Sequence, residues 1–304
     1  RGSVKHIPAL LTALAASAFA SACAQSTSVE APNWAAFENP QPVTVTGYSG
    51  DLMEPFLSRD GQILFFNNRN QPAEQTDLHW AERVDDVTFR YRGLVAGANT
   101  ADNLDAVATM SAEGRLCFVS LRSYFESLGT IYCGDWANGD VENVALQAAL
   151  TQNILGRLVF DAEVAADGDT IIYADGTFTG EPFPARADLR TGALSDLGFV
   201  ITPERDATLA ALNTPALEFA PALSSDGLMI AFTRADGRLP FIRFGIWLAR
   251  RDDVNAAFGE PVLISAIRGG LFEAPTFSPD NRALYYHRSE NDRYSLWRVS
   301  LPSE

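Results

Sequence analysis

Short apolar runs separated by turn signals recur along most of the chain at a regular spacing. Five segments align on one another, and in each a turn is followed by a run that is apolar at nearly every position. The runs read ILFFN, LCFVS, TIIYA, MIAFT and ALYYH. A strand that is apolar on both faces is buried on both faces, so this pattern favours sheets packed face to face.

A four-residue turn precedes each apolar run. It starts with Ser or Ala, has an acid at its third position and ends with Gly or Asn. The five turns are Ser58–Gly61, Ser111–Gly114, Ala165–Gly168, Ser224–Gly227 and Ser278–Asn281. An acid followed by Gly is a hairpin signal, because the acid bonds nearby backbone and Gly adopts the left-handed conformation. The turns start 53, 54, 59 and 54 residues apart, which is the scale of one four-stranded propeller blade.

The repeat predicts an all-β chain, namely a five-bladed β-propeller of four-stranded antiparallel blades over residues 42–304. The fifth repeat lacks residues for an outer strand, whereas the strand-like stretch PVTVTG at 42–47 precedes the first repeat. We expect this N-terminal strand to join the last blade and close the ring, which protects sheet edges. The best helix candidates are residues 143–156 and 206–219.

The repeats resemble the TolB-type propeller family. The resemblance rests on the Ser-Pro-Asp-Gly-like turn, a preceding Pro (Pro55, Pro221 and Pro275), the apolar strand and a trailing Arg, and it covers roughly residues 42–304. It implies an exported β-propeller that binds proteins or ligands. The chain departs from TolB, which has six blades and an additional N-terminal domain.

Residues 1–22 read as a signal peptide, since Arg1 and Lys5 precede an apolar stretch that is too short for a comfortable membrane span. Two cleavage patterns remain open. One is an ordinary signal-peptidase site beside Cys23. The other resembles a lipobox in which Cys23 becomes lipidated, although the usual Leu is missing. Both predict a bacterial periplasmic protein or outer-membrane lipoprotein, with residues 23–41 as a linker.

Composition narrows the possible partners. Hydrophobic residues make up 47% of the 304 residues, which is enough for a sizeable core, and charged residues make up 20%. The net charge of −15 gives no electrostatic attraction to nucleic acid or to an anionic membrane face. We therefore expect a monomer that binds an envelope protein or a small ligand and meets the membrane only through a lipid anchor. Lys5 is the only lysine, which excludes Schiff-base and P-loop lysines beyond the signal peptide.

Cys117 and Cys133 are the only cysteines after Cys23. If their runs form a hairpin centred near Phe125, the two positions lie opposite each other. An oxidising compartment would then allow a cross-strand disulfide. The alternative is a pair of buried thiols.

Acidic residues stand just before the innermost strand expected in every blade. These channel-mouth candidates are Glu54, Asp105, Asp161, Glu218 and Glu273. Crowded carboxylates raise one another's pKa and can form an acid–base pair or a calcium site. Glu54 and Asp161 stand one place before the Pro position of the repeat, Asp105 and Glu218 stand three places before it, and Glu273 stands two places before it. The five acids are therefore not in strict register. The alternative is that they pair with Arg or cap turns.

An arginine ends the apolar strand in four repeats, at Arg69, Arg122, Arg234 and Arg288, and the third repeat lacks it. Beside a recurring acid, this Arg predicts an ion pair between blades. The alternative is an anion receptor in the channel. His287 stands next to Arg288 and has no equivalent in the other repeats, so it joins the channel-mouth candidates.

The loop SYFES predicts a contact site for a partner, because Tyr124 and Phe125 at a hairpin tip have no core to fill. Catalytic and zinc-binding motifs are missing from the sequence. We predict no metal and no cofactor, with calcium as the one candidate. The first hypothesis is a non-catalytic binding scaffold of the cell envelope, and the alternative is a glycan-directed hydrolase that uses carboxylates at the propeller channel.

Overall fold

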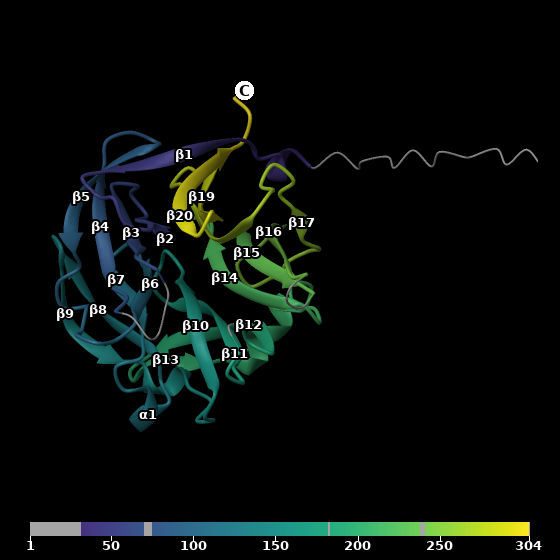
Figure 1. Cartoon of the computed structure of the whole chain (residues 1–304). Helices are drawn as coiled ribbons and strands as arrows, with labels where there is room; N and C mark the ends of the chain where they lie inside the picture. The colour runs from purple at the N-terminus through teal and green to yellow at the C-terminus, as the bar shows by residue number, and fades with distance from the viewer. Residues whose placement is uncertain (1–31, 70–74, 182, 238–240, 304) are drawn as a thin grey trace, which may run out of the picture. The chain divides into compact units, whose positions relative to one another are not determined.

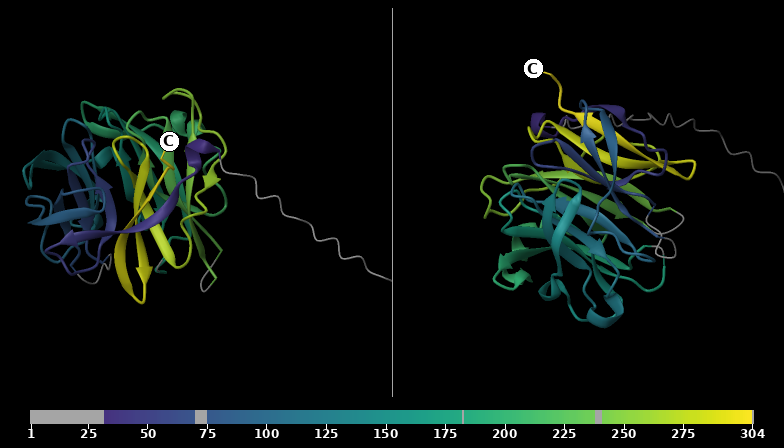
Figure 2. Two further views of the ribbon diagram at one scale, coloured as in Figure 1. Left: turned by 90° about the horizontal axis from the view of Figure 1, so that it is seen from above. Right: turned by 90° about the vertical axis from the view of Figure 1, so that its left-hand side faces the viewer.

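The computed structural model describes residues 32–69, 75–181, 183–237 and 241–303. Over these residues, twenty strands form five four-stranded blades arranged around an axis (Figures 1 and 2). The predicted all-β, five-bladed propeller is confirmed. The stretch predicted to be a signal peptide and Cys23 lie outside the described residues.

The strands of blades 1 to 4 follow one another in chain order from the axis to the rim. Blade 1 contains β2 (Met53–Leu57), β3 (Ile63–Asn67), β4 (Leu78–Arg83) and β5 (Thr88–Leu94), and blade 2 contains β6 (Asp105–Met110), β7 (Arg115–Ser120), β8 (Ile131–Ala137) and β9 (Asp140–Leu146). Blade 3 contains β10 (Arg157–Val164), β11 (Thr170–Thr177), β12 (Arg186–Ser195) and β13 (Gly198–Ile201), and blade 4 contains β14 (Leu217–Leu223), β15 (Met229–Asp236), β16 (Arg243–Arg250) and β17 (Val262–Leu263). Blade 5 contains β18 (Leu271–Phe277), β19 (Ala283–Glu290) and β20 (Arg293–Ser300), with β1 (Glu38–Thr46) as its outer strand.

The N-terminal strand β1 closes the ring as predicted. It runs antiparallel to β20, with Val43 opposite Leu296. It also pairs in parallel with β5 of blade 1, with Val45 opposite Phe89, so one sheet of eight strands spans both blades (Figure 1). The strand begins at Glu38, four residues before the stretch expected from the sequence.

Helices are few and short. The described part of the chain contains α1 (Tyr124–Ser127) and the 3-10 turns η1 (Asn33–Ala35), η2 (Ala148–Leu150) and η3 (Pro203–Leu209). Neither of the two best helix candidates forms an α-helix: residues 143–156 divide between β9 and η2, and residues 206–219 divide between η3 and β14. No helix among the described residues is long and apolar enough to cross a membrane.

The hydrophobic core is divided among the interfaces between neighbouring blades. One cluster, for example, combines Phe56 and Phe65 of blade 1 with Met110 and Phe118 of blade 2. Four further clusters fill the other interfaces. Each second strand, such as β3, lies between two such clusters, which explains why its sequence is apolar at nearly every position.

The repeated turns fold as their chemistry requires. In blade 1, Ser58 donates to Asp60 and accepts from the N–H of Ile63 at 2.9 Å, while Asp60 accepts from the N–H of Gln62 at 3.0 Å. Gly61 has φ +73°. Ser and Asp thus satisfy the backbone donors that open the next strand.

Every innermost strand contains a β-bulge near its middle. In four of them the bulge residue is left-handed, at Glu54, Val107, Ala220 and Ala274. A bulge leaves an N–H group outside the ladder, and this group needs another acceptor. At all four residues a side chain supplies that acceptor.

Cys117 and Cys133 are joined by a disulfide between β7 and β8, where they lie opposite each other and are buried. We predict that replacing both cysteines with Ala lowers the free energy of unfolding by about 3 kcal/mol, the value expected for a bridge that closes a loop of this size. Urea unfolding with and without a reductant measures this. The wild type should lose stability in reductant, whereas the double variant should not respond to it; equal stability of both proteins in oxidising buffer would contradict the prediction.

Candidate functional site

A narrow cavity lies on the propeller axis, lined by all five innermost strands. Its volume is about 20 Å³, which is room for water but not for a sugar ring. Glu54 of blade 1 and Asp161 of blade 3 line it. Glu273 of blade 5 lies close by, with a carboxylate oxygen within 4.8 Å of one of Glu54. Three acids from three blades therefore lie close together at the predicted channel mouth.

Arg59 closes the opposite end of the channel. Its guanidinium donates to the carboxylate of Glu163 at 2.7 Å and to the carbonyls of Met110 and Leu223, each at 3.2 Å. It also donates to the carbonyl of Val164. These three carbonyls belong to the last residues of β6, β10 and β14. Arg59 thus joins four blades at the end where the innermost strands finish, and the carboxyl cluster faces the other end, where the longer loops lie.

Asp105 and Glu218 do not belong to the channel cluster. Asp105 accepts from the N–H and hydroxyl of Thr100 and forms an ion pair with Arg122 at 2.7 Å. Glu218 is held in the same way by Thr214 and by Arg234 at 2.8 Å. Both acids are fully buried. They are the two that stand three places before the Pro position, so their different spacing corresponds to a structural role.

These ion pairs lie within one blade, and the predicted pairing between blades is wrong for Arg122 and Arg234. Asp105 is on β6, and Arg122 follows the end of the neighbouring strand β7 in the same blade. Blade 3 has the pair with its charges exchanged, since Arg157 on β10 bonds Asp175 on β11. The Arg missing from the third repeat is thus replaced by an acid with its own partner.

Arg69 and Arg288 do not reach the channel acids in any ion pair among the described residues. Arg69 pairs with Asp51 at 3.3 Å and Asp292 at 3.1 Å, which belong to loops of the blade 5–blade 1 seam. Arg288 pairs with Glu290 on its own strand. An anion receptor made of four arginines in the channel is therefore excluded.

Asp161 has a strongly perturbed proton affinity. Burial raises its pKa well above the ordinary value, and the nearby charges of Glu54 and Glu273 raise it further. The N–H of Ala220 donates to its carboxylate at 3.1 Å, which lowers the pKa by a smaller amount. The surroundings of Asp161 thus favour its protonated form.

His287 is fully buried beside these acids. Its Nδ1 accepts the bulge N–H of Glu54 at 3.1 Å, and its Nε2 lies 3.8 Å from Oε1 of Glu273. Burial lowers the pKa of His287, but Glu273 and Glu54 outweigh burial and raise it above the ordinary value. The N–H of Glu54 acts against the charged form, because an imidazolium has no lone pair left at Nδ1.

The cluster offers oxygen ligands rather than a complete metal site. Donor atoms of Glu54, Glu273 and His287 lie within 4.8 Å of one another. However, a histidine that binds a metal through one nitrogen usually donates the N–H of the other, and Nδ1 of His287 instead accepts a hydrogen bond. The carboxylates suit a hard cation such as calcium, but His287 does not fit as its ligand.

The SYFES loop presents one aromatic side chain and buries the other. Tyr124 is 8% exposed, and its hydroxyl accepts the N–H of Gly156 at 2.8 Å. Its expected role as a contact residue is wrong, because its side chain is buried beside the loop that contains Gly156. Phe125 is 85% exposed, and the loop whose Gly156 bonds Tyr124 also exposes Ile154 and Leu155.

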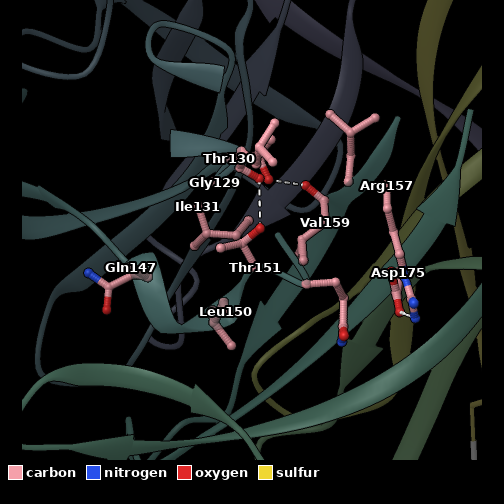
Figure 3. A pocket seen from close by; sticks show the side chains of 12 residues that line it. Gly129, Thr130, Ile131, Gln147, Leu150, Thr151, Arg157, Val159 and Asp175 are labelled. Atoms are coloured by element: carbon pink, nitrogen blue, oxygen red, sulfur yellow. Dashed lines mark hydrogen bonds and ion pairs between the residues drawn. The ribbon is translucent and has the colours of Figure 1, made fainter. Parts of the chain in front are cut away.

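A second hollow between blades 2 and 3 has little capacity. It measures about 10 Å³ and is lined by residues that include Thr130, Thr151 and Val159 (Figure 3). Thr130 donates to the carbonyl of Val159, and the Arg157–Asp175 pair lies at its side (Figure 3). This volume holds no more than a water molecule, so it offers no ligand site.

No protein-family model matches the chain, and no curated protein matches it in sequence. Solved structures do match it. A glycoside hydrolase has a TM-score of 0.55 at 8% identity, covering 88% of this chain and 92% of that chain. The α-L-arabinanase of Cellvibrio cellulosa, complexed with arabinohexaose, has a TM-score of 0.53 at 12% identity, covering 84% and 94%. The chain shares the propeller fold. At these identities the likeness shows nothing further.

TolB from Acinetobacter baumannii is also similar, with a TM-score of 0.47 at 16% identity. The match covers 84% of this chain but only 55% of TolB, so the chain spans about half the length of that protein. This degree of similarity does not establish membership of the TolB family.

Sequence reasoning missed Arg59 and the two threonines that hold the buried acids. One signal for Arg59 was available, because the second position of the other four turns holds Ala112, Ala166, Ser225 and Pro279. A second signal was the Asn-Thr pair at 99–100 and again at 213–214, shortly before each Arg-bound acid.

Proposed function

We propose that the chain is a glycan-directed hydrolase that uses the carboxyl groups of Glu54, Asp161 and Glu273. The observation that carries this proposal is their convergence on the axis, at the end of the channel opposite Arg59. Hydrolysis of a glycosidic bond needs one protonated and one ionised carboxyl group close together. The propeller glycosidases among the similar structures share the fold and are compatible with the proposal.

Asp161 takes the role of proton donor, because burial and its acidic neighbours raise its pKa and favour its protonated form. Glu273 has the more accessible side chain, 15% exposed, and takes the role of the second carboxyl group at the mouth. Glu54 assists by raising the pKa of Asp161 through its charge. The cavity of about 20 Å³ admits water, so the sugar lies over the mouth and only its reacting bond meets the carboxyl groups.

We further propose that the enzyme works in the bacterial cell envelope. The signal-like residues 1–22 and the disulfide between Cys117 and Cys133 support export, because stable disulfides form in oxidising compartments. Oligosaccharides and polysaccharides are the substrate class that an exported glycosidase meets.

The test is release of reducing ends from a panel of plant and bacterial polysaccharides and of aryl glycosides. The purified chain should cleave at least one member, and Glu273→Gln, prepared in the same way, should not. Equal release by both proteins would show a contaminating hydrolase. No release from any member by the wild type would remove the proposal.

A second candidate is the non-catalytic scaffold, favoured by the exposed Phe125. A photo-crosslinking amino acid at position 125 should then capture an envelope protein in growing cells, whereas the same group at the exposed position Arg90 on β5 should not. This outcome, together with no glycan cleavage, would select the scaffold over the hydrolase.

We expect Phe125→Ser to change the free energy of unfolding by no more than about 0.5 kcal/mol, because the ring is exposed. Tyr124→Ala should cost several times more, since it removes a buried ring and its bond to Gly156. Urea unfolding of both variants measures the difference. A large loss in Phe125→Ser would show that this ring has a structural contact instead.

A further inference from the structure

One position on the second strand of a blade accepts a bulge N–H from the next blade. The three side chains that do this are Asn67 toward Val107, Thr233 toward Ala274 and His287 toward Glu54, each at 3.1 Å. Asn and Thr perform this task with a single oxygen. Accepting the bulge N–H at this position therefore does not require a histidine.

His287 differs from Asn67 and Thr233 in having a second polar atom. Its Nε2 is buried and has no hydrogen-bond partner among the described residues. Since Nδ1 accepts a hydrogen bond, the proton of the neutral ring is on Nε2. The imidazole thus directs an N–H donor at the channel carboxyl groups, with Oε1 of Glu273 at 3.8 Å.

The ionisable groups around this ring come from three strands. Glu54 on β2 and Glu273 on β18 face its two nitrogens, and the ring of Tyr294 on β20 lies 5.6 Å away. Hydrogen bonds in a catalytic site often stand long without substrate and shorten when it binds. A small movement of Glu273, or one water in the axial cavity, would join it to Nε2.

We propose that His287 is a positioning residue, whose Nε2–H orients the carboxylate of Glu273. A hydrogen bond from an N–H is directional, so a carboxylate that accepts it is held in one orientation. The catalytic role of His287 rests on the proposed hydrolase activity, whereas the orientation of its ring is independent of that activity.

The first experiment tests the ring itself. Long-range ¹⁵N NMR of the histidine-labelled chain, followed across the titration of His287 to the alkaline side where the ring is neutral, should show a protonated Nε2 and an acceptor Nδ1, assigned by its loss in His287→Asn. A ring protonated on Nδ1 alone would overturn the proposal, because Nε2 would then have no proton to donate.

The second experiment tests the effect on Glu273. In His287→Asn the oxygen can still accept the N–H of Glu54, as Asn67 accepts the N–H of Val107, so the fold should persist. With a glycan that the wild type cleaves, we expect kcat to fall about 10- to 100-fold while KM changes little, because only the orientation of Glu273 is lost. The control is Asn67→Thr at the equivalent position of blade 1, whose partner Val107 is not next to a channel acid in the sequence, and it should match the wild type.

The outcomes are separable. An unchanged kcat in a folded His287→Asn would reject the positioning role while leaving the hydrolase intact. If the wild type cleaves no glycan, the proposed function fails, and the NMR result still decides whether His287 offers its Nε2–H to the channel.

Discussion

Replacing Asp161 with Asn should reduce glycan hydrolysis about 10²- to 10⁴-fold, the usual contribution of a general acid, and at the same time stabilise the fold at neutral pH. Asn cannot transfer a proton, but its oxygen can still accept the N–H of Ala220. It also removes a carboxyl group that burial and two neighbouring acids make costly to ionise. A loss of activity combined with a gain of stability is typical of a residue retained for function.

The pH dependence of stability gives a second readout of the same substitution. Because the pKa of Asp161 is raised in the fold, the native state holds this proton more tightly than the unfolded chain does. Its contribution to stability is therefore complete below the unfolded carboxyl range and is lost as pH rises through the folded pKa. Urea unfolding between pH 4 and 9 should show a smaller decline in Asp161→Asn than in the wild type. Parallel curves, or a less stable variant at pH 7, would contradict the assignment.

Replacing Arg59 with Met should lower the free energy of unfolding by about 3–5 kcal/mol, because it leaves Glu163 buried without its cation. The side chains of Arg59 and Glu163 are 11% and 4% exposed. Arg59 also bonds the carbonyls of Met110 and Leu223, so the substitution removes ties from blade 1 to three other blades. Urea or thermal unfolding measures the loss.

The matched control is Arg92→Met, which removes an ion pair with Glu82 whose partners are each 45% exposed. This change should stay within about 0.5 kcal/mol. The double variant Arg59→Met with Glu163→Gln should recover part of the loss, since no buried charge is then left unpaired. If Arg59→Met were no worse than Arg92→Met, Arg59 would not close the channel in solution.

Most of the fold could be predicted because each blade repeats the same local chemistry. The Ser and Asp of the turn satisfy the first donors of the next strand, as Ser58 and Asp60 do, and the apolar run after it requires packing on both faces. Hairpin geometry alone also predicted that Cys117 and Cys133 lie opposite each other. By contrast, residues 143–156 are apolar at helical spacing, yet β9 and η2 divide them because sheet pairing outweighs helix propensity there.

The candidate site could be predicted only in part. The five acids were found, but their separation into two Arg-bound residues and three channel residues depends on bulges that rotate each side chain. The role of Arg59 depends on a side chain that crosses the axis to reach Glu163, far away in sequence. Local sequence patterns do not report such contacts, because they arise only when all blades are assembled.

Closure by β1 has a consequence for how the protein is made. Its partners on β20 lie about 250 residues further along the chain, and such distant pairing makes folding slow. Until both strands are present, the edges of β5 and β20 remain open and can pair with other chains. The chain is therefore most prone to aggregation before β1 has paired with β20 and closed the ring.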